Sequence, residues 1–128
     1  MKSLRTPLGR VTGLGSARNG VHHWWLQRLT SIALVPLAIW FTVSLLSLHA
    51  LDHVTVVAWM AQSWTALLLV LFVLVGTWHS QLGVRVVIED YMHGGSKTLL
   101  LVVVTFLHGL VAVAGTFAVL KVAFGGAG

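Results

Sequence analysis

The segment Gly76–Tyr91 reads GTWHSQLGVRVVIEDY; it starts inside a long apolar run and ends on the only adjacent pair of carboxylates in the chain. An ionisable side chain such as His79 is costly inside hydrocarbon and needs a partner there. On a helix, Gly76 and Gly83 share the face of His79. Two positions without Cβ atoms leave space for a flat group against the backbone, which favours His79 as an axial haem ligand. The alternative is a histidine hydrogen-bonded to a neighbouring helix.

Asp90 and Tyr91 follow His79 by eleven and twelve residues. Eleven helical residues rise roughly 16 Å, so His79 is expected near the middle of the membrane and Asp90 and Tyr91 at its surface. A tyrosine hydroxyl there can donate to a quinone carbonyl, and an adjacent carboxylate can orient it or relay protons. The alternative is an ordinary helix end with an interfacial tyrosine. Arg85 and Glu89 are spaced to pair with each other.

Composition places the whole chain in a membrane. Of 128 residues, 57% are hydrophobic and only 9% are charged, whereas about a quarter of the residues of a soluble domain are charged. Three windows lack Asp, Glu, Lys and Arg, and each reaches the roughly 20 residues that a spanning helix needs: Leu29–Leu51, Val54–Val84 and Thr98–Leu120. These runs do not alternate as barrel strands do. The sequence therefore predicts an all-α integral membrane protein with three transmembrane helices.

The predicted organisation has two parts, an irregular cytoplasmic N-terminal arm at residues 1–20 and a three-helix transmembrane domain at residues 21–128. Pro36 is expected to kink the first helix. Trp59 is placed in a partly interfacial segment, Thr55–Ser63, that leads into the second helix. The predicted helices are Leu29–His49, Trp64–Glu89 and Thr98–Phe124, with a loop at Asp90–Lys97.

The distribution of basic residues predicts orientation. Lysines and arginines gather before the first span and between Arg85 and Lys97, and the loop around Asp52 has none. The positive-inside rule therefore places the N-terminus in the cytoplasm and the C-terminus outside. The chain has no cysteine, which excludes disulfides, iron–sulfur ligation and covalent c-type haem attachment by this chain.

Two further sets of residues bear on a haem site. His22 and Arg28 lie where the first helix enters the membrane, and they could hold haem propionates or anionic lipid headgroups; the alternative is a pair of ordinary snorkelling anchors. A bis-histidine haem also needs a second ligand. His108 in the third span is the other buried candidate in the chain, unless that ligand comes from another subunit.

Three short motifs follow one another along the chain: R-N-G-V-H at Arg18–His22, R-x-T-S from Arg28, and H-x3-G-x6-D-Y from His79. In this order, and with three spans laid out from about Gly15 to Phe124, the chain resembles the D-type hydrophobic membrane anchor of bacterial succinate dehydrogenase. The resemblance implies a heterotetramer of a flavoprotein, an iron–sulfur protein and two three-helix anchors. This chain would be half of a haem-binding anchor dimer, with the C-type anchor as the other half.

The same resemblance implies roles for particular residues. His79 is similar to the ligand that the D-type anchor supplies to the iron of a shared haem b, the other ligand coming from the partner anchor. His22 and Arg28 resemble haem-propionate neighbours. Tyr91 resembles the tyrosine that contacts ubiquinone, with Asp90 beside it. The doublet His22-His23 departs from the pattern and leaves open which of the two faces the haem.

The expected function is that of a membrane-anchor subunit of succinate:quinone oxidoreductase in the bacterial inner membrane. It would pass electrons from a soluble iron–sulfur partner to quinone and have no dehydrogenase activity alone. One alternative is an anchor of a fumarate reductase or another di-haem cytochrome b. Another is a small transporter or assembly protein whose histidines act in proton relay or helix packing, although transporters usually show more spans or internal repeats.

Overall fold

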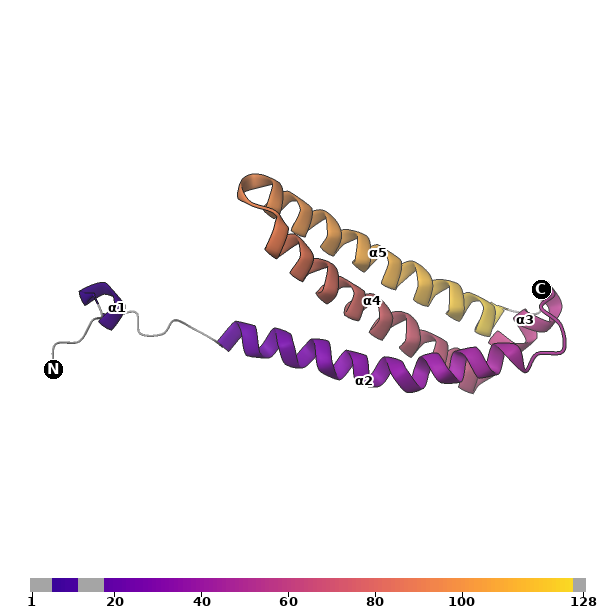
Figure 1. The fold of residues 1–128 in the computed structure, drawn as a ribbon. Coiled ribbons are helices and arrows are strands. Elements are labelled where there is room, and N and C mark those ends of the chain that lie inside the picture. The colour runs from indigo at the N-terminus through magenta and orange to yellow at the C-terminus, as the bar shows by residue number, and fades with distance from the viewer. Residues whose placement is uncertain (1–5, 12–17, 126–128) are drawn as a thin grey trace.

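The computed structural model describes residues 6–11 and 18–125, and within these ranges all regular structure is helical. A short helix, α1 (Pro7–Val11), lies apart from the rest (Figure 1). The other elements are α2 (Arg18–Leu46), α3 (His53–Met60), α4 (Ser63–Tyr91) and α5 (Gly94–Gly125). The segments 20–46, 63–91 and 94–125 are apolar and long enough to cross a membrane. The predicted all-α fold with three spans is confirmed.

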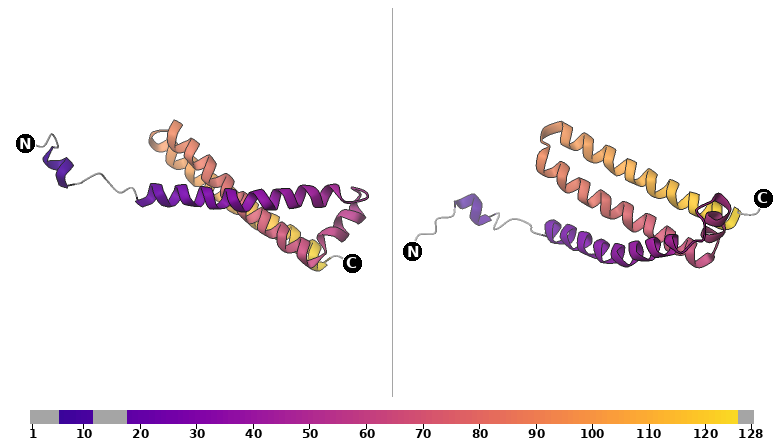
Figure 2. Two further views of the ribbon diagram at one scale, coloured as in Figure 1. Left: turned by 60° about the horizontal axis from the view of Figure 1, so that its bottom comes forward. Right: turned by 45° about the vertical axis from the view of Figure 1, so that its right-hand side comes forward.

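The three long helices form an open layer with α4 in the middle. α4 packs against α5 along its length and against α2 on its other side, while the backbones of α2 and α5 do not come close to each other within the described ranges. Figure 2 shows that α4 and α5 run side by side, whereas α2 crosses them and diverges from α4 toward its own N-terminal end. The end of α2 that begins at Arg18 and the end of α4 that stops at Tyr91 therefore face each other across a wedge.

Three hydroxyl side chains of the long helices bond to the backbone of their own helix. The hydroxyls of Thr30, Ser31 and Thr105 each donate to the carbonyl four residues earlier, at 2.7 to 2.8 Å. Such bonds are expected where hydrocarbon offers no water to these groups. α2 continues through Pro36, and its ribbon curves along its length (Figure 1). Because proline removes one backbone N–H and crowds the preceding turn, it bends this helix without ending it.

The segment before α4 differs from the prediction. It forms a separate helix, α3, and Trp59 is a core residue with 8% of its surface exposed. The rings of Trp40 and Phe41 each lie 6.2 Å from the Trp59 ring, centroid to centroid, and aromatic pairs at this spacing are favourable. Asp52 caps α3 by accepting a hydrogen bond from the Thr55 backbone N–H at 2.8 Å. That bond holds the pKa of the Asp52 carboxyl below its ordinary value.

Three boundaries also differ from the prediction. The arm at residues 1–20, expected to be irregular, contains α1. The first long helix, predicted at Leu29–His49, is α2 at Arg18–Leu46, so it begins within the predicted arm and ends before the predicted end. The predicted loop Asp90–Lys97 is reduced to residues 92 and 93, because α4 continues through Tyr91 and α5 begins at Gly94. Gly94 has a φ of +66°. Glycine adopts this conformation without a steric penalty, which is why so short a turn can reverse the chain here.

The contact between α4 and α5 depends on a small residue. A Cβ atom added at Gly115 would lie 2.9 Å from Cγ1 of Val73, whereas one added at Gly109 on the same helix would meet nothing within 4 Å. Small residues at helix crossings let backbones approach closely in membranes, where packing rather than the hydrophobic effect holds helices together. Gly115 therefore marks the close approach of α5 to α4.

Candidate functional site

His79 points from α4 toward α2, where two polar side chains meet it. Its Nδ1 lies 2.9 Å from the Thr30 hydroxyl oxygen, and its Nε2 lies 3.5 Å from the amide nitrogen of Gln27. The Thr30 hydroxyl also lies 2.8 Å from the Leu26 carbonyl oxygen. Nδ1 is thus firmly bonded, and Nε2 has only a contact at the outer limit of a hydrogen bond.

Gly76 and Gly83 face the same helix as His79. A Cβ atom at Gly76 would lie 3.7 Å from Leu34 Cδ2, and one at Gly83 would lie 3.8 Å from the Gln27 amide nitrogen. The common face that the spacing predicts is therefore present. In this structure α2 side chains cover that face, so a flat group beside His79 would require Leu34 and Gln27 to move aside.

A polar cavity of about 570 Å³ lies in the wedge between the start of α2 and the end of α4. Both histidines of the doublet line it, and a buried ring nitrogen of His23, Nε2, has no hydrogen-bond partner in the described part of the chain. Apart from its place in the doublet, His23 carries no sequence signal that would single it out. The lining residues are Gly20, His22, His23, Leu26, Trp78, Gln81, Leu82, Arg85 and Glu89.

Arg28 does not line this cavity. Its side chain is exposed, and its guanidinium carbon lies 5.1 Å from the centroid of the Trp24 ring, a cation–π contact. His22 and Arg28 are both at the N-terminal part of α2, as predicted, but the structure places only His22 in the cavity wall. Arg28 is oriented along the outside of its own helix.

Charged groups at the end of α4 hold the turn to α5. Arg85 Nε donates to Glu89 Oε1 at 2.8 Å, which confirms the predicted pair, and Lys97 Nζ donates to the Glu89 backbone carbonyl at 3.2 Å. Asp90 and Tyr91 follow at the last turn of α4. Both are exposed, Tyr91 by 79%, and within the described ranges neither side chain has a hydrogen-bond partner. They are free to meet a group from outside the chain.

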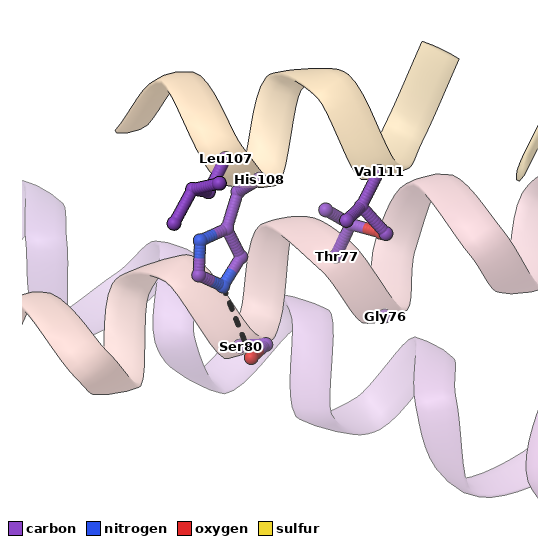
Figure 3. Close-up of a pocket in the computed structure, with 6 residues that line it drawn as sticks. All are labelled: Gly76, Thr77, Ser80, Leu107, His108 and Val111. Atoms are coloured by element: carbon purple, nitrogen blue, oxygen red, sulfur yellow. Dashed lines mark hydrogen bonds between the residues drawn. The ribbon is translucent and has the colours of Figure 1, made fainter. Parts of the chain in front are cut away.

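His108 occupies a different position from His79. Figure 3 shows its ring between α5 and α4, with Nε2 3.2 Å from the Ser80 hydroxyl oxygen. Its Nδ1 lies 2.8 Å from the Val104 carbonyl oxygen, so both ring nitrogens have partners. The ring borders a cavity of about 380 Å³ that Gly76 and Thr77 also line. Because His79 contacts α2 and His108 contacts α4 from α5, the chain does not bring the two imidazoles together.

Comparison with known proteins bears on what this arrangement does. Residues 2–120 match the family described as "Succinate dehydrogenase/Fumarate reductase transmembrane subunit". The chain belongs to this family. The match covers all three membrane-spanning helices except the last residues of α5, and it includes every residue of the candidate site.

Individual members of the succinate dehydrogenase/fumarate reductase transmembrane family support the match. The chain is 29% identical over 120 residues to the succinate dehydrogenase hydrophobic membrane anchor subunit of Paracoccus denitrificans, covering 94% of this chain and 93% of that protein. Subunits of the same name from Rickettsia conorii and Rickettsia bellii are each 36% identical, over 72% and 69% of this chain and 75% and 70% of theirs. No solved structure gives a significant match.

Proposed function

We propose that this chain is a membrane-anchor subunit of succinate:quinone oxidoreductase that supplies one axial ligand to a haem b and part of a ubiquinone site. The observation that carries the anchor role is the family match over residues 2–120, together with relatives that are named as succinate dehydrogenase anchors. Family membership argues against the small transporter or assembly protein. The names of the relatives favour succinate dehydrogenase over fumarate reductase.

The residues around His79 fit a haem. Nε2 of His79 has only the 3.5 Å contact with Gln27, and the Gln27 amide oxygen is buried without a partner in the described part of the chain. Polar groups that are left unsatisfied inside an apolar span indicate a site that is completed by something else. Haem b, when bound, supplies a one-electron carrier. His79 would hold its iron, Gly76 and Gly83 would add no side chains of their own beside the imidazole, and Leu34 and Gln27 of α2 would move aside.

His22 and Arg28 are proposed to hold the haem propionates. His22 lines the polar cavity between α2 and α4, and His23 beside it has the unpaired nitrogen, so either histidine of the doublet can serve an anionic group there. Arg28 would reach the same group only by leaving its stacked position on Trp24. An arginine can make that change because its long side chain is exposed.

Tyr91 and Asp90 are proposed to form part of the quinone site. Both are exposed at the end of α4, on the side of the membrane that the positive-inside rule assigns to the cytoplasm. Tyr91 would donate its hydroxyl hydrogen to a quinone carbonyl, and Asp90 would orient the ring or deliver a proton. The soluble iron–sulfur and flavoprotein subunits would dock on this side, and the C-type anchor would complete the haem site. The complex would lie in the bacterial inner membrane, and this chain alone would carry no dehydrogenase activity.

A difference spectrum of the purified complex tests the haem part of the proposal. The chain is purified with its native partners, and reduced-minus-oxidised spectra are compared for wild type, His79→Ala and His53→Ala. His53 is a suitable control because it is an exposed histidine at the start of α3, at the far end of the molecule. We expect His79→Ala to abolish or shift the b-type bands and His53→Ala to leave them unchanged. An unchanged spectrum in His79→Ala would assign the ligand to another residue.

A further inference from the structure

The hydroxyl of Thr30 is the strongest polar contact of His79, and its hydrogen bonds can be counted. A hydroxyl has one hydrogen to donate. The Thr30 oxygen lies 2.8 Å from the Leu26 carbonyl oxygen and 3.1 Å from the Gln27 carbonyl oxygen, which can only accept. The Gln27 carbonyl already accepts the Ser31 hydroxyl hydrogen at 2.7 Å. Between the two carbonyls, the hydrogen of Thr30 therefore goes to that of Leu26, which leaves the Thr30 oxygen as an acceptor. If Thr30 donated to Nδ1 of His79 instead, the hydrogen of the neutral imidazole would lie on Nε2, opposite the Gln27 amide nitrogen.

With the Thr30 hydrogen on the Leu26 carbonyl, the 2.9 Å contact between Thr30 and His79 is bridged by a hydrogen on Nδ1 of the imidazole. A neutral imidazole carries one N–H, so Nε2 keeps its lone pair. Gln27 is arranged in agreement, because its amide nitrogen, which can only donate, is the atom that faces Nε2 at 3.5 Å. A hydrogen on Nε2 would place two donors opposite each other. A doubly protonated imidazolium would do the same and would add a charge within the apolar span.

We propose that Thr30 is a positioning residue for His79: its hydroxyl accepts the Nδ1 hydrogen, fixes the ring orientation and leaves Nε2 with the lone pair that an iron ligand needs. This inference rests on the proposed haem-ligand role of His79. Histidines that bind metals donate their other ring N–H to an acceptor that fixes the tautomer and raises the basicity of the ligand. Here the acceptor is a hydroxyl backed by a main-chain carbonyl, in the order His79, Thr30, Leu26. Each bond in such a chain polarises the next.

Substitution of Thr30 tests the role of its oxygen separately from that of its shape. Thr30→Val keeps the branched side chain and removes the acceptor, and Thr30→Ser keeps the acceptor and removes the methyl group. Thr105→Val is a matched control, because Thr105 makes the same bond to the carbonyl four residues earlier, at 2.7 Å, but its side chain is exposed on α5. Flavin content and subunit ratio of each purified complex report whether the variant has assembled.

Two measurements on the purified complexes report on the hydrogen bond between His79 and Thr30. They are the rate at which haem transfers to excess apomyoglobin and the midpoint potential of the haem. Loss of a partner behind a ligand weakens metal binding about 10–100-fold, so we expect haem transfer to be faster by about that factor in Thr30→Val. The potential should rise, because a less basic imidazole stabilises ferric iron less. Thr30→Ser and Thr105→Val should match wild type in both measurements.

The possible results separate this inference from the proposed function. If His79→Ala loses the haem spectrum while Thr30→Val keeps wild-type potential and haem retention, Thr30 has no positioning role and the ligand assignment stands. If His79→Ala keeps the spectrum, the proposed haem role fails. If Thr30→Ser behaves like Thr30→Val, the methyl group and packing matter rather than the oxygen, which also overturns the inference. Should Thr30→Val fail to assemble, the comparison of Thr30→Ser and Thr30→Ala in the same two measurements decides.

Discussion

His79 and Ser80 are consecutive residues of α4 whose side chains contact different neighbouring helices. Nδ1 of His79 lies 2.9 Å from the Thr30 oxygen in α2, and the Ser80 oxygen lies 3.2 Å from Nε2 of His108 in α5. Consecutive helical residues point about 100° apart, which lets the central helix of an open layer bond to both of its neighbours at one level. The two interior histidines of the chain therefore have different surroundings, and they are expected to have different tasks.

His108 is expected to join α5 to α4 and to take no part in haem ligation. Both of its ring nitrogens are already bonded, to Ser80 and to the Val104 carbonyl. His108→Ala should therefore leave the b-type spectrum nearly unchanged, in contrast to His79→Ala. A double-mutant cycle of His108→Ala and Ser80→Ala should show a coupling of about 0.6 kcal/mol, the average for hydrogen bonds between membrane helices. Loss of haem in the His108 variant would mean that this histidine reaches the iron.

The sequence is sufficient to predict the spans and the order of the candidate residues. Windows free of charge locate all three membrane helices, and the spacing from His79 correctly places Asp90 and Tyr91 at a helix end. It is also sufficient to place Gly76, His79 and Gly83 on one face. These features depend on helix geometry and on the exclusion of charge from hydrocarbon, and both are local properties of the chain.

The sequence is not sufficient to predict which face meets which neighbour. A helix that is apolar on all sides has no polar face to indicate its orientation. For this reason nothing in the pattern pairs Ser80 with His108 or Thr30 with His79. The sequence also does not predict that Trp59 is buried, because Trp40 and Phe41 of α2, far away along the chain, pack against its ring. Such contacts depend on how the chain reverses at residues 47–52, and the periodicity of apolar residues in the sequence carries no information about that reversal.

Gly115 should be intolerant of any side chain. A Cβ atom there would lie 2.9 Å from Cγ1 of Val73, and the χ1 angle of valine is too stiff to move that methyl group away freely. Overpacking of this kind destabilises by about 1–3 kcal/mol, so Gly115→Ala should lower the thermal unfolding midpoint of the purified complex. Gly109→Ala is the matched control, because a Cβ atom there meets nothing within 4 Å.

Shortening Val73 should relieve the effect of Gly115→Ala. In the double variant Val73→Ala and Gly115→Ala, the contacting Cγ1 atom is removed. The decrease in its thermal unfolding midpoint should therefore be smaller than the sum of the decreases in the two single variants. Equal midpoints for Gly115→Ala and Gly109→Ala would show that α4 and α5 are not this close in the assembled complex.

Topology follows from the basic residues that flank the spans. Reporter fusions after Asp52 and after Gly128 should be active as periplasmic reporters, and a fusion after Gly95 should be active as a cytoplasmic one, because Arg85 and Lys97 flank that turn. Paired alkaline phosphatase and green fluorescent protein fusions at each site check the assignment with opposite signals. A cytoplasmic C-terminus would contradict three complete crossings.

Tyr91→Phe tests the quinone role, because it keeps the ring and deletes only the hydroxyl. The ring lies at the end of α4 and is 79% exposed in the isolated chain, so a quinone and the docked partners can reach it. A hydrogen bond from the phenol to a quinone carbonyl would strengthen as negative charge grows on that oxygen during reduction. A donor in a fully desolvated site contributes about 10²–10³ in rate, whereas an ordinary hydrogen bond contributes about 0.5–1.5 kcal/mol, roughly two- to tenfold.

For Tyr91→Phe we therefore expect the rate of quinone reduction to fall by more than the roughly two- to tenfold of an ordinary hydrogen bond and by less than the about 10²–10³ of a fully desolvated donor. Succinate oxidation with a soluble dye should be unchanged. The dye reaction bypasses the quinone site, so it reports whether the soluble partners are still bound and active. Trp64→Phe is the control: it removes a polar N–H from an exposed aromatic ring at the opposite end of α4, and both activities should persist. Equal quinone reduction by wild type and Tyr91→Phe would remove Tyr91 from the site.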